Sequence, residues 1–82
     1  MNRVKKYLSN VRVKTKLYLN MRNKRVELNL TKVKISQLIG ISPSRYRSYE
    51  DGICDPPLHI LVKILDVLQV QDAYLFITKE LN

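Results

Sequence analysis

The spacing of apolar residues along the chain predicts two helices in its first half. The first covers about residues 15–28, and its inner side carries Leu17, Met21, Leu28 and also Val26. The second follows Thr31, a candidate N-cap, and ends at Gly40, because glycine suits the left-handed residue that closes a helix. Both segments have a length that is ordinary for helices of a small domain.

A serine followed by a proline predicts the start of a third helix, over about residues 43–51. Ser42 is placed as an N-cap, and proline at the first helical position loses no hydrogen bond because that N–H has no partner in a helix. At about 100° per residue, one side of this helix carries Tyr46, Tyr49 and Glu50. The other side carries Pro43, Ser44, Arg47 and Ser48, with Arg45 at its flank. The inner side is therefore aromatic, and the outer side is small and basic.

Two further helices make the predicted fold all-α. The fourth covers about residues 57–69, and its apolar residues occupy an arc of roughly 220°, about twice what one core-facing stripe needs. This helix is therefore expected either to be central or to meet a partner. The fifth covers about residues 72–78 and carries Leu75, Phe76 and Ile77. Only two glycines and three prolines interrupt these helix-forming residues.

Residues 1–14 are expected to form a basic extension that precedes a single domain of residues 15–78. Val4, Leu8 and Val11 follow helical spacing, whereas Val11, Val13 and Thr15 alternate as in a strand. These two patterns overlap, so the sequence leaves the conformation of the extension open.

Positive charge is concentrated near the N-terminus. Of the 82 residues, 15 are Lys or Arg and seven are Asp or Glu, which gives a formal charge of +8. Residues 1–34 hold eleven of the basic residues against Glu27 alone, whereas residues 35–82 hold four against six acidic ones. A one-sided basic surface is typical of proteins that bind polyanions such as nucleic acid. A solvated basic tail would have the same composition, and charge alone does not separate the two.

The sequence also predicts a soluble cytoplasmic protein with no membrane partner. Its apolar stretches are too short to span a bilayer, and its basic start is not followed by the apolar segment of a signal peptide. The single cysteine, Cys54, cannot form a disulfide within the chain, which fits a reducing compartment.

Residues 30–52 contain a series of spaced motifs: Leu30-Thr31, the small Ser36, the turn Gly40-Ile41-Ser42 and the ending Glu50-Asp51-Gly52. This series resembles the XRE/Cro/CI family of lambda-repressor-like DNA-binding domains. With weaker matches on both sides, the likeness covers about residues 17–77. It implies a five-helix lambda-repressor-like fold in which the third helix is the recognition helix in the DNA major groove.

The resemblance also assigns roles to individual residues. The base-reading residues would be Pro43, Ser44, Arg45, Arg47 and Ser48. Arginine can bind a guanine with two hydrogen bonds, and serine can donate to or accept from any base. The alternative for this surface is a solvated helix face without a partner.

Phosphate contacts are expected from two parts of the chain. The starts of the second and third helices would supply Thr31, Lys32 and Ser42, and the basic extension would supply Lys5, Lys6, Arg12 and Lys14. Lys32 stands where the family usually has glutamine, so it keeps a phosphate contact but cannot brace the recognition helix with an amide. Arg25 and Glu50 resemble the family's structural pair between the first helix and the end of the third.

Three departures from the family pattern stand out. The loop after the third helix contains Asp51 and Asp55, which would repel DNA phosphates, where the family commonly has polar and basic residues. Val33 and Leu38 are apolar where the family prefers polar residues. Some other segment is therefore expected to cover them, and the N-terminal extension is the nearest candidate.

Catalysis is not expected. His59 is the only histidine and falls on the polar side of the fourth helix with Lys63 and Asp66. No metal-ligand spacing and no phosphate-binding glycine loop occur, so no metal, cofactor or small-molecule ligand is expected. The sequence predicts a sequence-specific regulator that binds double-stranded DNA as a homodimer. It resembles a small repressor of a phage or mobile element, associated with the nucleoid and acting by promoter occlusion.

One alternative function remains open. A protein-interaction adaptor, similar to an antitoxin or a coactivator, could keep this fold without reading operators. The acidic loop favours the adaptor, whereas the basic first third favours the regulator.

Overall fold

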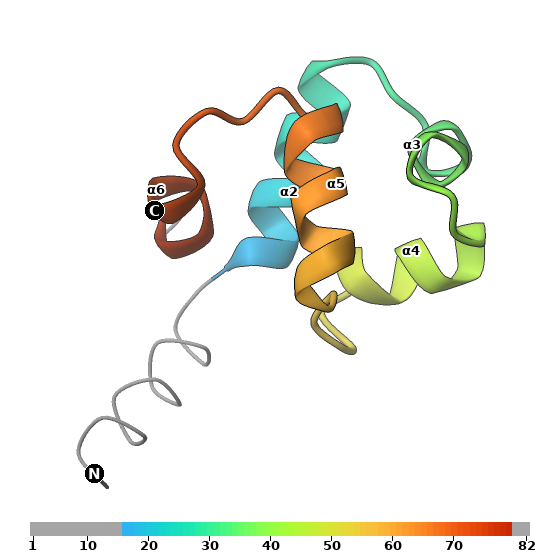
Figure 1. Cartoon of the computed structure of the whole chain (residues 1–82). Coiled ribbons are helices and arrows are strands. Elements are labelled where there is room, and N and C mark those ends of the chain that lie inside the picture. The colour runs from blue at the N-terminus through green and yellow to red at the C-terminus, as the bar shows by residue number, and fades with distance from the viewer. Residues whose placement is uncertain (1–15, 80–82) are drawn as a thin grey trace, which may run out of the picture.

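The computed structural model describes residues 16–79, which form five helices and contain no strand (Figure 1). In chain order they are α2 (Leu17–Glu27), α3 (Lys32–Ile39), α4 (Pro43–Glu50), α5 (Leu58–Val67) and α6 (Ala73–Thr78). The all-α prediction is thus confirmed, and each helix begins and ends within two residues of its expected bounds. The predicted basic extension lies outside the described residues.

The helix starts are fixed by side chains that accept backbone hydrogen bonds. The Thr31 hydroxyl accepts from the N–H of Lys34 at 3.0 Å, and the Ser42 hydroxyl accepts from that of Arg45 at 3.1 Å. Each bond satisfies one of the N–H groups that have no partner within a helix. α3 ends at Gly40, whose φ of 81° lies in the left-handed region, as the sequence predicted.

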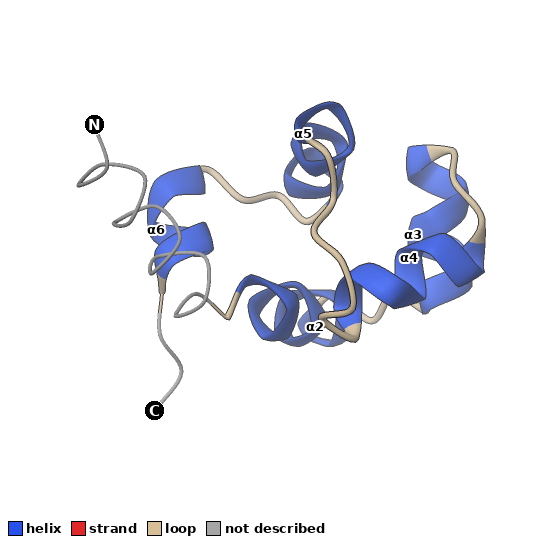
Figure 2. Ribbon diagram, turned by 90° about the horizontal axis from the view of Figure 1, so that it is seen from below, coloured by secondary structure: helices blue, strands red, loops and turns tan. Residues whose placement is uncertain are grey.

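The helices occupy the two ends and the middle of the domain. Figures 1 and 2 show α3 and α4 together at one end of the domain and α6 at the other, with α2 and α5 between them. α3 contacts both α4 and α5, and α2 contacts both α4 and α6. The short α3 and α4 are therefore held against two longer helices, which buries one side of each.

A single small core joins four of the helices. Its buried apolar side chains are Met21, Ile35, Ile39, Tyr46, Tyr49, Ile60, Ile64 and Leu68. Half-buried residues close its edges, including Leu17, Leu28, Ile41, Val67, Val70 and Phe76. Two of the large core residues are tyrosines, so the core also contains polar hydroxyl groups that need hydrogen-bond partners.

The prediction that Val26 lies on the inner side of its helix is wrong. Its side chain is 56% exposed, and the buried polar residues Asn20 and Arg25 face inward beside Met21. Arg25 lies four residues after Met21, so both fall on one helix face, whereas Val26 is rotated away by about 100°. A search for apolar residues alone passes over such buried polar positions.

Arg25 links three parts of the fold. Its guanidinium donates to both carboxylate oxygens of Glu50, with Nε–Oε2 at 2.5 Å and Nη2–Oε1 at 3.2 Å. It also donates through Nη1 to the carbonyl of Leu30 at 2.7 Å. The Tyr46 hydroxyl donates to Glu50 Oε2 at 2.7 Å. These bonds join α2, the connection after it and the end of α4 in one hydrogen-bond network. Both charged side chains of this network are buried.

This network changes the acid–base properties of its members. The hydrogen bond from Arg25 to Glu50 raises the pKa of the guanidinium, although burial acts in the opposite direction. Burial, followed by the bond to Glu50, raises the pKa of the Tyr46 phenol above its usual value. Arg25 therefore stays charged and Tyr46 stays a neutral donor over the whole physiological pH range.

We predict that Glu50→Gln lowers the free energy of unfolding by about 3 kcal/mol, because it leaves the Arg25 charge buried without its counter-ion. The matched control is Glu27→Gln, since Glu27 pairs with Lys24 at 3.4 Å on the surface. An exposed pair of this kind contributes about 0.5 kcal/mol. Urea denaturation of the three proteins tests the prediction, and equal losses for both variants would contradict it.

Candidate nucleic-acid interface

α3 and α4 are joined by a tight turn over residues 40–42. The N–H groups of Gly40 and Ile41 both donate to the Ser36 carbonyl, at 2.9 and 3.0 Å. Ser36 itself is fully buried, and its hydroxyl donates to the Val33 carbonyl at 2.7 Å. A small residue is needed there because α3 packs closely on α4 and α5. The two helices and this turn form a helix-turn-helix arrangement.

α4 has a buried side and an exposed side. Tyr46, Tyr49 and Glu50 are at most 3% exposed, as the sequence predicted. Four predicted base-reading residues are exposed on the other faces: Pro43, Ser44, Arg45 and Arg47. The fifth, Ser48, is half-buried. The structure therefore brings the five residues together on one helix, but not in equivalent environments.

The Ser48 hydroxyl already has partners within the protein. It donates to the Arg45 carbonyl at 2.7 Å and lies 3.4 Å from the Cys54 thiol. A hydroxyl has one proton, so the thiol is the donor in the second contact. The loop also folds back onto α4, because the N–H of Ile53 donates to the Ser48 carbonyl at 3.0 Å. In the free protein the Ser48 hydroxyl is therefore engaged by two internal contacts.

Arg45 is held by a residue of its own helix. Its Nε–H donates to the Tyr49 hydroxyl at 2.9 Å, one turn farther along α4. Arg45 lies at the flank of the exposed face and Tyr49 in the core, as predicted, but the bond between them is a feature that the sequence prediction missed. Their spacing of four residues was the available signal, because residues four apart are neighbours on a helix surface.

The predicted phosphate-binding residues that the structure describes lie at two helix starts. Thr31 and Ser42 are the exposed N-caps of α3 and α4, and Lys32 is the half-buried first residue of α3. N–H groups at helix starts favour anions. The four residues predicted in the extension lie outside the described residues: Lys5, Lys6, Arg12 and Lys14.

The loop after α4 is acidic, exposed and closely packed at one point. Asp51 and Asp55 are both exposed residues, and Ile53 is 75% exposed. Gly52 has a φ of 74°, and a Cβ there would lie 3.3 Å from the Tyr18 ring. Val33 and Leu38 are both about half exposed on α3. The segment that was expected to cover these two residues lies outside the described part of the chain.

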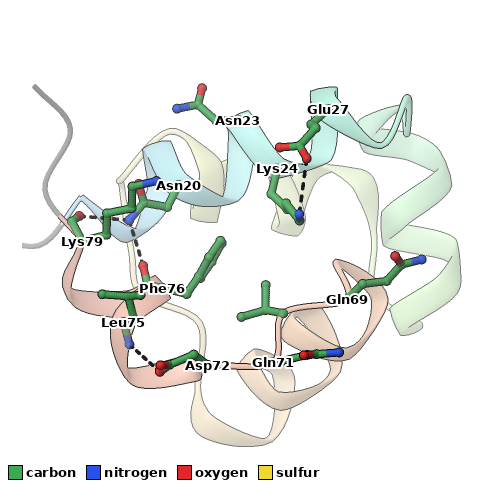
Figure 3. Close-up of a pocket in the computed structure, with 11 residues that line it drawn as sticks. Asn20, Asn23, Lys24, Glu27, Gln69, Gln71, Asp72, Leu75, Phe76 and Lys79 are labelled. Atoms are coloured by element: carbon green, nitrogen blue, oxygen red, sulfur yellow. Dashed lines mark hydrogen bonds and ion pairs between the residues drawn. The ribbon is translucent and has the colours of Figure 1, made fainter.

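A pocket of about 440 Å³ lies at the opposite end of the domain, between α2 and α6 (Figure 3). Some of its polar groups have partners within the protein: Lys24 pairs with Glu27, and Asp72 accepts from the N–H of Leu75 at 3.0 Å. Asn20 donates to the carbonyls of Phe76 and Lys79, at 2.8 and 3.1 Å. The two Asn20 bonds attach the end of α6 to α2.

The described residues contain no group of three or more His, Cys, Asp or Glu side chains that could hold a metal ion. His59, Lys63 and Asp66 are exposed on α5, as predicted. Among residues 16–79, no helix is long and apolar enough to cross a membrane.

Comparison with known proteins places this arrangement in a family. A family model described as Helix-turn-helix matches residues 21–75, which is more than half of the chain and includes all of α3 and α4. The chain belongs to the XRE-type helix-turn-helix family. The resemblance found in the sequence is thereby confirmed.

One curated protein also matches part of the chain. The cryptic phage CTXphi transcriptional repressor RstR of Vibrio cholerae serotype O1 is 40% identical over 48 residues. The matched segment is 58% of this chain and 43% of that repressor, so the chain spans less than half of the relative's length. No solved structure matches the chain.

We predict that Ser42→Ala lowers the free energy of unfolding by about 1 kcal/mol, because the N-cap bond to the Arg45 N–H is lost. Ser44→Ala is the matched control, since Ser44 is exposed two residues farther along the same helix. It should change stability by less than about 0.5 kcal/mol. Thermal denaturation of both variants tests this prediction, and a large loss for Ser44→Ala would contradict it.

Proposed function

We propose that this XRE-type protein is a sequence-specific, duplex DNA-binding transcriptional repressor. The observation that carries the proposal is the exposed polar and basic side of α4, held outward by the buried Tyr46, Tyr49 and Glu50 within a helix-turn-helix. A helix of this kind fits the major groove. The similarity to a phage transcriptional repressor supports the same function.

In this proposal, base reading depends on the exposed side of α4. Arg47 is exposed and can bind a guanine with two hydrogen bonds, and Ser44 can donate or accept. Ser48 bonds the Arg45 carbonyl in the free protein, so donation to a base would replace that bond, whereas acceptance from an amino group of adenine or cytosine would not. Pro43 lies beside them and limits the approach of the helix start.

Phosphate binding would position α4 on the duplex. Thr31, Lys32 and Ser42 stand at the starts of α3 and α4, and the basic extension would add Lys5, Lys6, Arg12 and Lys14. Such contacts give affinity that depends on salt and not on sequence. The positive charge of the extension would also offset the repulsion between DNA and the acidic loop.

The simplest mechanism is occlusion of a promoter, which needs no catalytic step. We infer that the protein is not an enzyme, uses no cofactor and acts in the cytoplasm, associated with the nucleoid of a bacterial cell. The adaptor function, similar to an antitoxin or coactivator, is the alternative. The family assignment and the repressor relative favour the DNA-binding function over it.

Selection of binding sites from random duplex DNA by the purified protein tests the proposal. We predict that a preferred site emerges and that Arg47→Ala weakens binding to it by about 10-fold while affecting random DNA little. Lys32→Ala should weaken both and lower the slope of log affinity against log salt by about 1. Lys63→Ala, on α5, is the control for removal of a surface charge.

Two outcomes would contradict this division of roles. Equal losses on specific and random DNA for Arg47→Ala would remove Arg47 from the base-reading set. Failure to enrich any site, with weak binding that is blind to sequence, would support the adaptor function instead.

We also infer that the repressor is a homodimer, because one small domain reads too few bases for useful specificity. α5 supports this, since Leu58 and Val62 are 76% and 57% exposed and lie about one turn apart on it. The α6 end, which carries the apolar Leu75, Phe76 and Ile77, is less suited to a dimer contact. Phe76 packs against the core, which leaves only its neighbours Tyr74 and Leu75 exposed.

We predict that the wild-type protein sediments as a dimer at micromolar concentration and that Val62→Lys shifts it to a monomer. Val26→Lys is a matched control, because Val26 is equally exposed but lies on α2. A wild-type monomer, both alone and on DNA, would contradict the homodimer.

A further inference from the structure

The side chain of Arg45 is restrained before any ligand binds. Its Nε donates to the Tyr49 hydroxyl at 2.9 Å, and the Tyr49 residue is only 3% exposed. The ring of Tyr49 is thus fixed in the core while its hydroxyl meets a surface arginine. This makes the hydroxyl a fixed anchor for a long and otherwise flexible side chain.

The restraint sets the direction of the Arg45 side chain. Tyr49 lies four residues later on α4, so the bond brings the guanidinium along the helix toward its C-terminal end. At about 100° per residue, Arg45 falls about 60° outside the arc that holds Pro43, Ser44, Arg47 and Ser48. A side chain at this flank, directed along the helix, is displaced from the bases that the exposed side would face.

The restraint also limits the chemistry that Arg45 offers. With Nε engaged, the two Nη groups remain to donate, and together they present the end-on fork that matches two oxygens of one phosphate. Glu50 does not compete for this guanidinium, because its carboxylate is bound by Arg25 and Tyr46. The Arg45 guanidinium is therefore an ordered cation at the flank of α4.

We infer that Arg45 binds a phosphate of the DNA backbone and that Tyr49 is its positioning residue. This inference rests on the proposed DNA-binding function, but it assigns Arg45 to backbone contact and not to the base reading that the family pattern implied. Tyr49 contributes by holding the guanidinium in place before binding, so that less side-chain freedom is lost in the complex. Arg47 is then the charged base reader of α4.

Salt titrations on two duplexes test the inference with the full chain, one containing the selected site and one of random sequence. Arg45→Ala should weaken binding to both by a similar factor, about 10-fold, and lower the salt slope by about 1. Tyr49→Phe keeps the ring and removes only the hydroxyl, and it should weaken both by about 5-fold. The double variant should bind no more weakly than Arg45→Ala alone.

Tyr46→Phe is the control for loss of a hydroxyl on the buried side of α4. Its hydroxyl bonds Glu50 and not Arg45, so the variant loses stability but should keep DNA affinity at temperatures where it is fully folded. In the free protein, nuclear magnetic resonance should show slow exchange of the Arg45 Nε proton with water. Tyr49→Phe should abolish this protection, and Tyr46→Phe should not.

The possible results separate this inference from the proposed function. A change of preferred base in Arg45→Ala, or additive losses in the double variant, would overturn the inference and leave the repressor function standing. If Arg45→Ala and Tyr49→Phe weaken binding to random DNA as expected but the wild type has no preferred site, the phosphate contact is supported. Sequence-specific repression is then contradicted. Absence of any binding to duplex DNA would overturn both.

Discussion

The buried ion pair between Arg25 and Glu50 is the interaction on which the rest of the structure depends. Two charges in a low-dielectric interior are tolerated only where each is fully paired, and here the pair holds α2 against the last residue of α4. The additional bonds to the Leu30 carbonyl and from Tyr46 leave little freedom in the angle between α2 and α4. Since Tyr46, Tyr49 and Glu50 share one side of α4, fixing Glu50 also fixes which side of α4 faces outward.

Buried hydrogen-bonded side chains of this kind also compensate for the small size of the core. The apolar cluster joins α2, α3, α4 and α5 but includes α6 only through the half-buried Phe76. Asn20, which is 4% exposed, attaches α6 by donating to two of its carbonyls, one of them at the end of the helix. A buried amide costs free energy unless it is hydrogen-bonded, so this position specifies one docking of α6 over others. The fold is therefore held at its two ends by hydrogen bonds and in its middle by apolar contact.

The parts that could be predicted from the sequence are those that depend on neighbouring residues. Thr31, Gly40 and Ser42 define helix ends through local bonds and local φ, so their roles could be assigned without a tertiary structure. Val26 could not be placed, because its exposure follows from Arg25 occupying the inner side of α2. The spacing of four residues makes a contact between Arg45 and Tyr49 possible, but whether it forms depends on how far the tyrosine hydroxyl projects from the core. The contact of Ser48 with Cys54 was not predictable, since it depends on a loop folding back. The family pattern supplied the pairing of Arg25 and Glu50, which lie 25 residues apart and which no local rule connects.

These internal bonds have a consequence for how much sequence one domain can read. Five side chains were assigned to bases, but the Ser48 proton and the Arg45 Nε are already used within the protein, and proline has no donor. Ser44 and Arg47 are then the side chains of α4 that keep their full donor capacity, and each good contact discriminates by about 1–3 kcal/mol. Two such contacts together give about 2–6 kcal/mol, which reaches only the lower part of the range of about 4–10 kcal/mol typical of specific operators. A second α4 on the same DNA would double the number of reading side chains. The internal hydrogen bonds of one helix thus leave a single domain with few base contacts, which is a physical argument for the homodimer proposed above.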